Sequence, residues 1–343
     1  MTARPLRGAE EPAPAWETAD EYEALCRARL EHVVPVREPL VLVSQIQRSG
    51  GTLLSQLFDG HPECHAHPKE LKWGYPRKRH WPPLDVGRPE QWFPMLYEKR
   101  VEVDLRHGYA KVSRHDLDHD TFPFLFSLRL QKRIFDECVE LRRPSRARDV
   151  LDCYLTSYFN AWLDNHNLYN GPKRVVTAFV PSLASKPENI ERVFSDYPDG
   201  RLIAIVRDPR GWYASARGHK PDRYGDVDRA IGMWREGAEA AIEATRRFGR
   251  RVVLFTYESL VRDPEPMMRL IAERIGISMH PSLLSPTFNG RPIRADSSYP
   301  VAGYGILAGR ASDYRARLEP ETLDRIAALA GDVYDRAAAA GES

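Results

Sequence analysis

The sequence has few cysteines and no long apolar run. Its four cysteines are scattered through 343 residues without a CxxC spacing, which argues against a disulfide framework and indicates a reducing compartment. It contains no window of about 18 uninterrupted apolar residues, and its first residues are charged and proline-rich where a signal peptide would be apolar. We therefore expect a cytoplasmic protein without a membrane partner.

A large net charge is also missing. Lys and Arg total 50 against 48 Asp and Glu, a net charge of +2. Such a balance provides no overall field to attract nucleic acid, so any anion site must be local. The length fits one or two domains and leaves the oligomeric state open.

Alternating strand and helix patterns predict an α/β fold. Short apolar runs predict buried strands at residues 39–46, 174–180, 201–206 and 251–257, with helical patterns after them. This order predicts a mainly parallel central sheet flanked by helices. We expect a flexible arm over residues 1–16, which lack apolar periodicity, and a single domain over residues 17–343.

An insertion of helical and irregular character is predicted over about residues 64–170. Residues 64–106 show no clean period, which predicts an irregular segment over the sheet edge, and residues 122–141 and 147–166 have helical spacing. Insertions of this kind often shape a pocket. The basic and aromatic run KELKWGYPRKRHW either lines an acceptor site or forms a solvated face.

A glycine turn follows the first predicted strand, in the stretch SQIQRSGGTLLSQLFDG. Gly50 and Gly51 bring an oxyanion within reach of the amides at a helix start, where the dipole is positive. Ser49 and Thr52 add hydroxyl donors, and Arg48 adds a fork-shaped cation. The pattern predicts a phosphate or sulfate site; the alternative, a glycine turn into an ordinary core helix, leaves Arg48 unexplained.

The phosphate-binding loop of nucleotide triphosphatases is absent. That loop would read GxxxxGK[ST], with a lysine before the hydroxyl residue that holds magnesium, whereas this turn reads Arg-Ser-Gly-Gly-Thr. A P-loop kinase or nucleotide triphosphatase is therefore a weaker hypothesis. A nucleotide-binding protein without catalysis is a further hypothesis.

A second strand ends in VRDPRGWYASAR. Arg207 follows the apolar run directly, Asp208 and Pro209 force a turn, and Ser215 lies about one turn into the next helix. Arg207 and Ser215 are candidates to hold a further phosphate. Taken alone, an arginine at this position is more often a strand-end ion-pair partner, for instance of Asp208.

Together these segments resemble the sulfotransferase family that uses 3′-phosphoadenosine 5′-phosphosulfate. Three motifs occur in order, xRSGxTxL, VRDPRxxxxSxR and RVVLFTYESLVRDPEPMMRLIAERIGI, and the resemblance covers about residues 40–70 and 175–277. It implies a P-loop-like sheet and transfer of a sulfuryl group to a hydroxyl of a small-molecule or carbohydrate acceptor. Adenosine 3′,5′-bisphosphate would be the product, and no metal is needed.

The resemblance also implies roles for individual residues. Arg48 would stabilise the departing phosphate oxygen, Arg207 and Ser215 would grip the 3′-phosphate, and Tyr257 would contact adenine. A late loop with Gly309 and Arg310 would close over the 3′-phosphate. The implied nucleotide-binding residues are Arg48, Ser49, Gly50, Gly51, Thr52, Leu53, Arg207, Ser215, Tyr257, Gly309 and Arg310.

The transfer needs a base for the acceptor proton, and two residues are candidates. Glu70 follows the first motif, where sulfotransferases of carbohydrates and tyrosyl peptides often have a catalytic glutamate; its alternative is a solvated side chain paired with Lys69 or Lys72. His115 is the second candidate, because cytosolic members use a histidine after a lysine-bearing strand, although its distance from Lys111 is longer than in that pattern.

A zinc site is a further alternative. The segment HPECHAH contains the possible ligands His61, Cys64, His65 and His67. It lacks the second ligand pair that closes a structural site, and His61 with the following proline is explained as a helix stop. We expect no metal.

Overall fold

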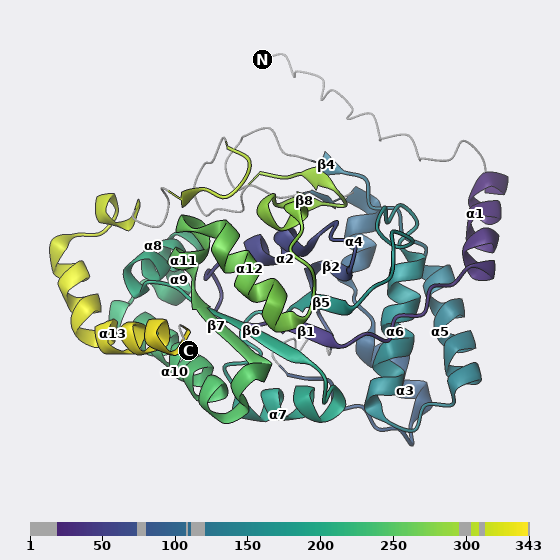
Figure 1. Ribbon diagram of the computed structural model, residues 1–343, viewed down its shortest axis with the longest axis horizontal. Helices are drawn as coiled ribbons and strands as arrows, with labels where there is room; N and C mark the ends of the chain where they lie inside the picture. Colours follow the sequence, from purple (N-terminus) through teal and green to yellow (C-terminus); the bar gives the residue numbers. More distant parts are fainter. Residues whose placement is uncertain are drawn as a thin grey trace, which may run out of the picture.

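The computed structural model describes residues 19–73, 80–107, 109–110, 121–294, 303–308 and 313–341. A five-stranded, all-parallel sheet forms the centre of the molecule, with helices on both faces (Figure 1). In spatial order its strands are β2 (Cys64–Glu70), β5 (Val175–Phe179), β1 (Leu40–Val43), β6 (Arg201–Val206) and β7 (Val252–Thr256). The predicted α/β class and parallel sheet are confirmed.

The strands are joined and covered by helices and short hairpins. The helices are α1 (Ala19–Glu31), α2 (Gly51–Phe58), α3 (Pro89–Leu96), α4 (Arg100–His107), α5 (Leu128–Arg142), α6 (Ala147–Ala161), α7 (Pro187–Asp196), α8 (Pro209–His219), α9 (Pro221–Tyr224), α10 (Val227–Phe248), α11 (Tyr257–Arg262), α12 (Pro264–Ile275) and α13 (Pro320–Gly341). Short 3-10 turns are η1 (Gly249–Arg251), η2 (Pro281–Leu284) and η4 (Asp313–Ala316), and two small hairpins pair β3 (Tyr109–Ala110) with β4 (Thr121–Phe122) and β8 (Thr287–Phe288) with β9 (Arg291–Pro292). Within these described residues, none of the helices has the length and apolar character needed to span a bilayer.

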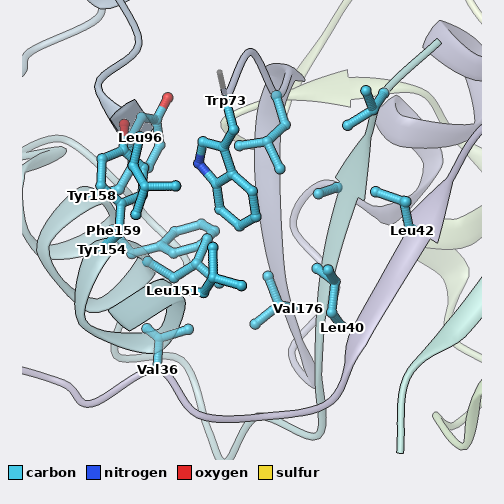
Figure 2. Packing of buried hydrophobic residues seen from close by; sticks show 14 of the residues in the cluster. Val36, Leu40, Leu42, Trp73, Leu96, Leu151, Tyr154, Tyr158, Phe159 and Val176 are labelled. Carbon is cyan, nitrogen blue, oxygen red and sulfur yellow. The ribbon is translucent and has the colours of Figure 1, made fainter. Parts of the chain in front are cut away.

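Strand β1 separates two hydrophobic layers, because successive side chains of a strand point to opposite faces. Leu40 and Leu42 pack with the aromatic face of α6, and Figure 2 shows them beside Val176 of β5 and opposite Tyr154 and Phe159. The alternate β1 residues join the layer formed with α2 and α12. All four β1 side chains are buried, which explains the continuous apolar run.

The expectation of an irregular segment from Cys64 onward is wrong, because residues 64–70 form edge strand β2. Cys64 and Ala66 face the α2 layer. On the other face His65 and His67 are buried against aromatic rings of α6, with ring centroids 5.1 and 4.6 Å from those of Phe159 and Tyr158. The strand was missed because histidines occupy positions where apolar residues are usual.

The helical part of the insertion also differs in its boundaries. The helix expected over residues 122–141 begins at Leu128, because the Ser127 hydroxyl accepts the Leu130 N–H and caps the first turn. Helix α6 ends at Ala161 instead of residue 166. The stretch expected to be irregular contains α3 and α4.

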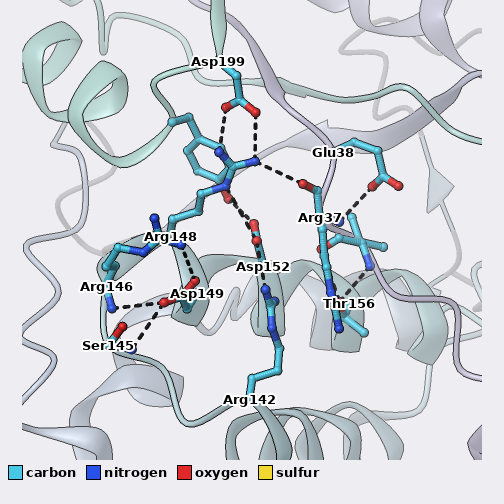
Figure 3. A network of polar contacts seen from close by, with 12 residues as sticks. Arg37, Glu38, Arg142, Ser145, Arg146, Arg148, Asp149, Asp152, Thr156 and Asp199 are labelled. Carbon is cyan, nitrogen blue, oxygen red and sulfur yellow. Dashed lines mark hydrogen bonds and ion pairs between the residues drawn. The ribbon is translucent and has the colours of Figure 1, made fainter.

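A partly buried polar network fixes α6 near the amino end of β6 (Figure 3). The Tyr197 hydroxyl donates to Asp152 at 3.0 Å. Arg148 makes two hydrogen bonds to the Asp199 carboxylate, at 2.7 and 3.1 Å. Burial raises the pKa of the Asp152 carboxyl to about 6. This network lies at the opposite end of β6 from Arg207, so it does not involve the carboxyl ends of the strands.

Candidate functional site

The two sequence motifs lie at the carboxyl ends of neighbouring strands. Strands β1 and β6 pair directly, with Leu42 opposite Leu202. The glycine turn leads from β1 into α2, and Arg207 leads from β6 into α8. Ligands of open parallel sheets bind at this edge, beside the helix N-termini.

The glycine turn has a backbone that few side chains tolerate. Gly50 has a φ of 98° and Arg48 a φ of 71°, both in the left-handed region. For a residue with a side chain this conformation costs about 1–2 kcal/mol. A Cβ atom on Gly50 would lie 2.5 Å from Cδ2 of Tyr257. Both the turn and the tyrosine contact therefore require glycine here.

Gly51 is equally confined. A Cβ atom there would collide with the side chains of Gln45 and Phe179. Neither residue was singled out from the sequence; Gln45, two residues beyond the last residue of β1, gave only a weak signal. Thr52 and Leu53 follow in the first turn of α2, and Leu53 packs against the hydrophobic layer of that face.

Arginine, serine and tyrosine side chains from three strand ends meet at this edge. Nε of Arg48 donates to Oγ of Ser215 at 3.3 Å. Nη1 of Arg207 donates to the Arg48 carbonyl oxygen at 3.1 Å. The Arg207 guanidinium lies 4.6 Å from the ring centroid of Tyr257, at the start of α11. The structure thus brings together the two motifs predicted to hold the 5′ and 3′ groups and the tyrosine predicted to contact adenine.

Arg207 is a partly buried cation without an acidic partner within ion-pair distance in the described chain. Asp208 pairs instead with Arg210, at 2.6 Å, so the ion pair considered between Arg207 and Asp208 does not form. Burial lowers the pKa of Arg207, and its Nε has no hydrogen-bond partner among the described residues. The same holds for the buried Oγ of Ser49. Unfilled donors beside a partly buried cation suit an anionic ligand.

Glu70 lies at the carboxyl end of β2, in register with Phe179. Because the Phe179 ring packs against Gly51, this register connects Glu70 to the glycine turn. The Glu70 side chain is 35% exposed, and its Oε2 lies 3.8 Å from Nζ of Lys72. Lys69 pairs with Asp104 at 2.5 Å. Glu70 therefore combines an accessible carboxylate with a position near the turn.

Three predicted site residues, His115, Gly309 and Arg310, lie outside the described residues. Two of the possible zinc ligands, His61 and His67, have other partners. Nδ1 of His61 accepts the Glu63 N–H at 3.1 Å, and Nε2 of His67 lies 3.2 Å from Glu98. Across the described part of the chain, no group of three or more His, Cys, Asp and Glu residues has the arrangement of a metal site.

Comparison with known proteins points to one family. A model described as "Sulfotransferase family" matches residues 39–281. No curated protein matches the chain.

Solved structures that resemble this chain also include sulfotransferases. A sulfotransferase domain from the curacin biosynthetic pathway has 17% identity and a TM-score of 0.47 over 86% of this chain and 98% of that one. The sulfotransferase domain of the Synechococcus PCC 7002 olefin synthase has 18% identity and a TM-score of 0.46 over 89% of this chain and 96% of that one. Mouse sulfotransferase SULT7A1 complexed with PAP has 10% identity and a TM-score of 0.38 over 90% of this chain and 88% of that one. The family assignment depends on the family model, because these identities and TM-scores are low.

We predict that Gly50→Ala destabilises the fold by more than the cost of its φ angle. Gly171→Ala is the matched control, because Gly171 also has a positive φ of 73° but nothing lies within 4 Å of its Cβ position. The control should lose roughly 1–2 kcal/mol in chemical denaturation, and Gly50→Ala should lose more. In a Tyr257→Ala background the difference should disappear. Equal losses in the wild-type background would contradict the close approach of Tyr257.

Proposed function

This chain belongs to the sulfotransferase family, and we propose that it transfers a sulfuryl group from 3′-phosphoadenosine 5′-phosphosulfate to a hydroxyl of a small-molecule or carbohydrate acceptor. Adenosine 3′,5′-bisphosphate is the second product. One observation carries the proposal: Arg48, Arg207, Ser215 and Tyr257 contact one another from three strand ends. A reducing cytoplasm, inferred from the scattered cysteines, is the proposed location.

In this proposal Arg207 and Ser215 hold the 3′-phosphate. The guanidinium offers a permanent charge and an unused Nε donor, and a hydrogen bond between charged groups is stronger than one between neutral groups. Tyr257 presents the ring that contacts adenine. Because Arg207 already lies over this ring, the adenine ring and the 3′-phosphate would be recognised side by side.

The 5′-phosphosulfate would occupy the glycine turn. The free amides at the start of α2 and the Ser49 hydroxyl are the donors available there. The acceptor oxygen attacks sulfur, the new S–O bond forms, and the bond between sulfur and the bridging phosphate oxygen breaks. Negative charge then develops on the departing bisphosphate, where Arg48 stabilises it.

The acceptor hydroxyl loses its proton as it attacks, and we assign this proton to Glu70. Its side chain is partly exposed and lies at the same sheet edge as the glycine turn. The carboxylate therefore combines solvent access with proximity to the reacting group, as a general base requires. His115 is the competing assignment.

Adenosine 3′,5′-bisphosphate should raise the melting temperature of the protein more than 5′-AMP does, because only the former engages Arg207 and Ser215. Arg207→Ala should remove most of this difference. Arg201→Ala is the control, because Arg201 lies at the opposite end of the same strand and, within the described part of the chain, its side chain bonds to the Asp199 and Gly200 carbonyls. Equal shifts for the two nucleotides in the wild-type protein would exclude the 3′-phosphate site.

Arg48→Ala should lower kcat by roughly 10²-fold or more, with a much smaller change in the Kd of adenosine 3′,5′-bisphosphate. The reason is that the interaction of Arg48 grows as charge develops on the leaving group. Steady-state kinetics and isothermal titration calorimetry measure the two effects. A loss of nucleotide affinity as large as the loss of kcat would assign Arg48 to ground-state binding.

Glu70→Gln should lower turnover by roughly 10²- to 10⁴-fold and leave nucleotide binding unchanged, because in this proposal the carboxylate acts on the acceptor proton and not on the nucleotide. The assay uses a radiolabelled sulfate donor against phenols, sugars and aliphatic alcohols, which also identifies the acceptor class. His115→Ala, tested in parallel, should retain activity. Full activity of Glu70→Gln with loss in His115→Ala would move the role of base to the histidine.

A further inference from the structure

The peptide unit between Arg207 and Asp208 is hydrogen-bonded at both ends by side chains. Its carbonyl oxygen, which belongs to Arg207, accepts Nε1–H of Trp234 at 3.0 Å. Its N–H, which belongs to Asp208, points to both carboxylate oxygens of Glu258, each at 3.2 Å. Trp234 lies on α10 and Glu258 on α11. Two helices thus fix the plane of the peptide from which the Arg207 side chain departs.

The Glu258 carboxylate holds the backbone amide of Asp208 and forms no ion pair with the neighbouring Arg207 guanidinium, among the residues that the structure describes. No ion pair joins Glu258 to Arg207, although both are described, and the other partner of Glu258 is the Tyr334 hydroxyl, which donates to Oε2 at 3.0 Å. Burial raises the pKa of Glu258. A buried carboxylate is costly unless its hydrogen bonds are made, so holding this backbone amide and this hydroxyl accounts for its presence.

The carboxyl-terminal part of the chain reaches the same turn at two points, one in α13 and one in η4. Tyr334 lies on α13, which packs against α10 and β7 (Figure 1). Upstream of α13, the Tyr314 ring lies 5.2 Å from the guanidinium of Arg210, the residue that pairs with Asp208. Elements more than a hundred residues after β6 therefore determine the geometry of the turn that follows it.

We propose that Glu258 and Trp234 are positioning residues for the 3′-phosphate: they orient the peptide between Arg207 and Asp208, and Tyr334 of the carboxyl-terminal helix completes the arrangement by fixing Glu258. The inference rests on the proposed function, because it acts through Arg207. A change of about 1 Å in the position of a binding group is enough to weaken such a site. Rotation of this peptide would redirect the guanidinium without unfolding the sheet.

The test uses the ratio of the 5′-AMP Kd to the adenosine 3′,5′-bisphosphate Kd, which isolates the contribution of the 3′-phosphate. Tyr334→Phe removes one hydroxyl, and this ratio should fall about threefold, the effect of one modest hydrogen bond. Glu258→Gln replaces one acceptor oxygen by a donor and should lower the ratio about tenfold. The 5′-AMP Kd itself should change little in either variant.

Tyr197→Phe is the matched control. Tyr197 also donates to a buried carboxylate at 3.0 Å, that of Asp152, and it lies before the amino end of β6, away from the turn. Loss of the Tyr197 hydroxyl should lower the melting temperature as Tyr334→Phe does, with no change in the Kd ratio. A purely structural role for Tyr334 would make the two variants alike in both measurements.

The outcomes separate the two proposals. A wild-type ratio near one would overturn the 3′-phosphate assignment itself and, with it, the positioning role. A wild-type ratio well above one that stays unchanged in both Tyr334→Phe and Glu258→Gln would overturn only the positioning role. A fall in both variants and none in Tyr197→Phe supports it.

Discussion

The ring of Tyr257 lies between two strand ends, and the geometry of the site depends on this contact. One side of the ring approaches Gly50 so closely that a Cβ atom would clash, and Arg207 lies over it. The ring therefore joins the glycine turn after β1 to the cation after β6. A side chain at position 50 would push these elements apart, which explains the glycine there. Arg48, two residues earlier, also has a left-handed backbone, so the turn is strained on both sides of Ser49.

The strand order explains why the anion determinants converge. The chain leaves β1 toward β2 and β5 on one side and later crosses to β6 and β7 on the other. Helices after β1 and β6 therefore begin side by side at the carboxyl edge. Among the described residues Arg207 forms no ion pair at this edge, because the acidic groups nearby bond to Arg210, to a backbone amide and to a tyrosine hydroxyl.

The two ends of β6 are held by similar buried bonds with different consequences. Near its amino end, Tyr197 and Asp152 fix α6 to the sheet. Beyond its carboxyl end, Tyr334 and Glu258 fix the Arg207 turn. The first bond supports the core alone, whereas the second supports a group that we propose touches the nucleotide. The same chemistry is thus structural or functional according to the strand end at which it occurs.

The sequence by itself determined the parallel sheet, the glycine turn and the Arg207 motif, because buried parallel strands and helix starts depend on local patterns. It did not reveal β2, where His65 and His67 occupy buried positions against aromatic rings. Nor did it reveal that Asp208 would pair with Arg210, or that Trp234, Glu258 and Tyr334 would hold the Arg207 turn. These contacts join residues far apart in the chain, so only packing of the helices on the sheet decided them.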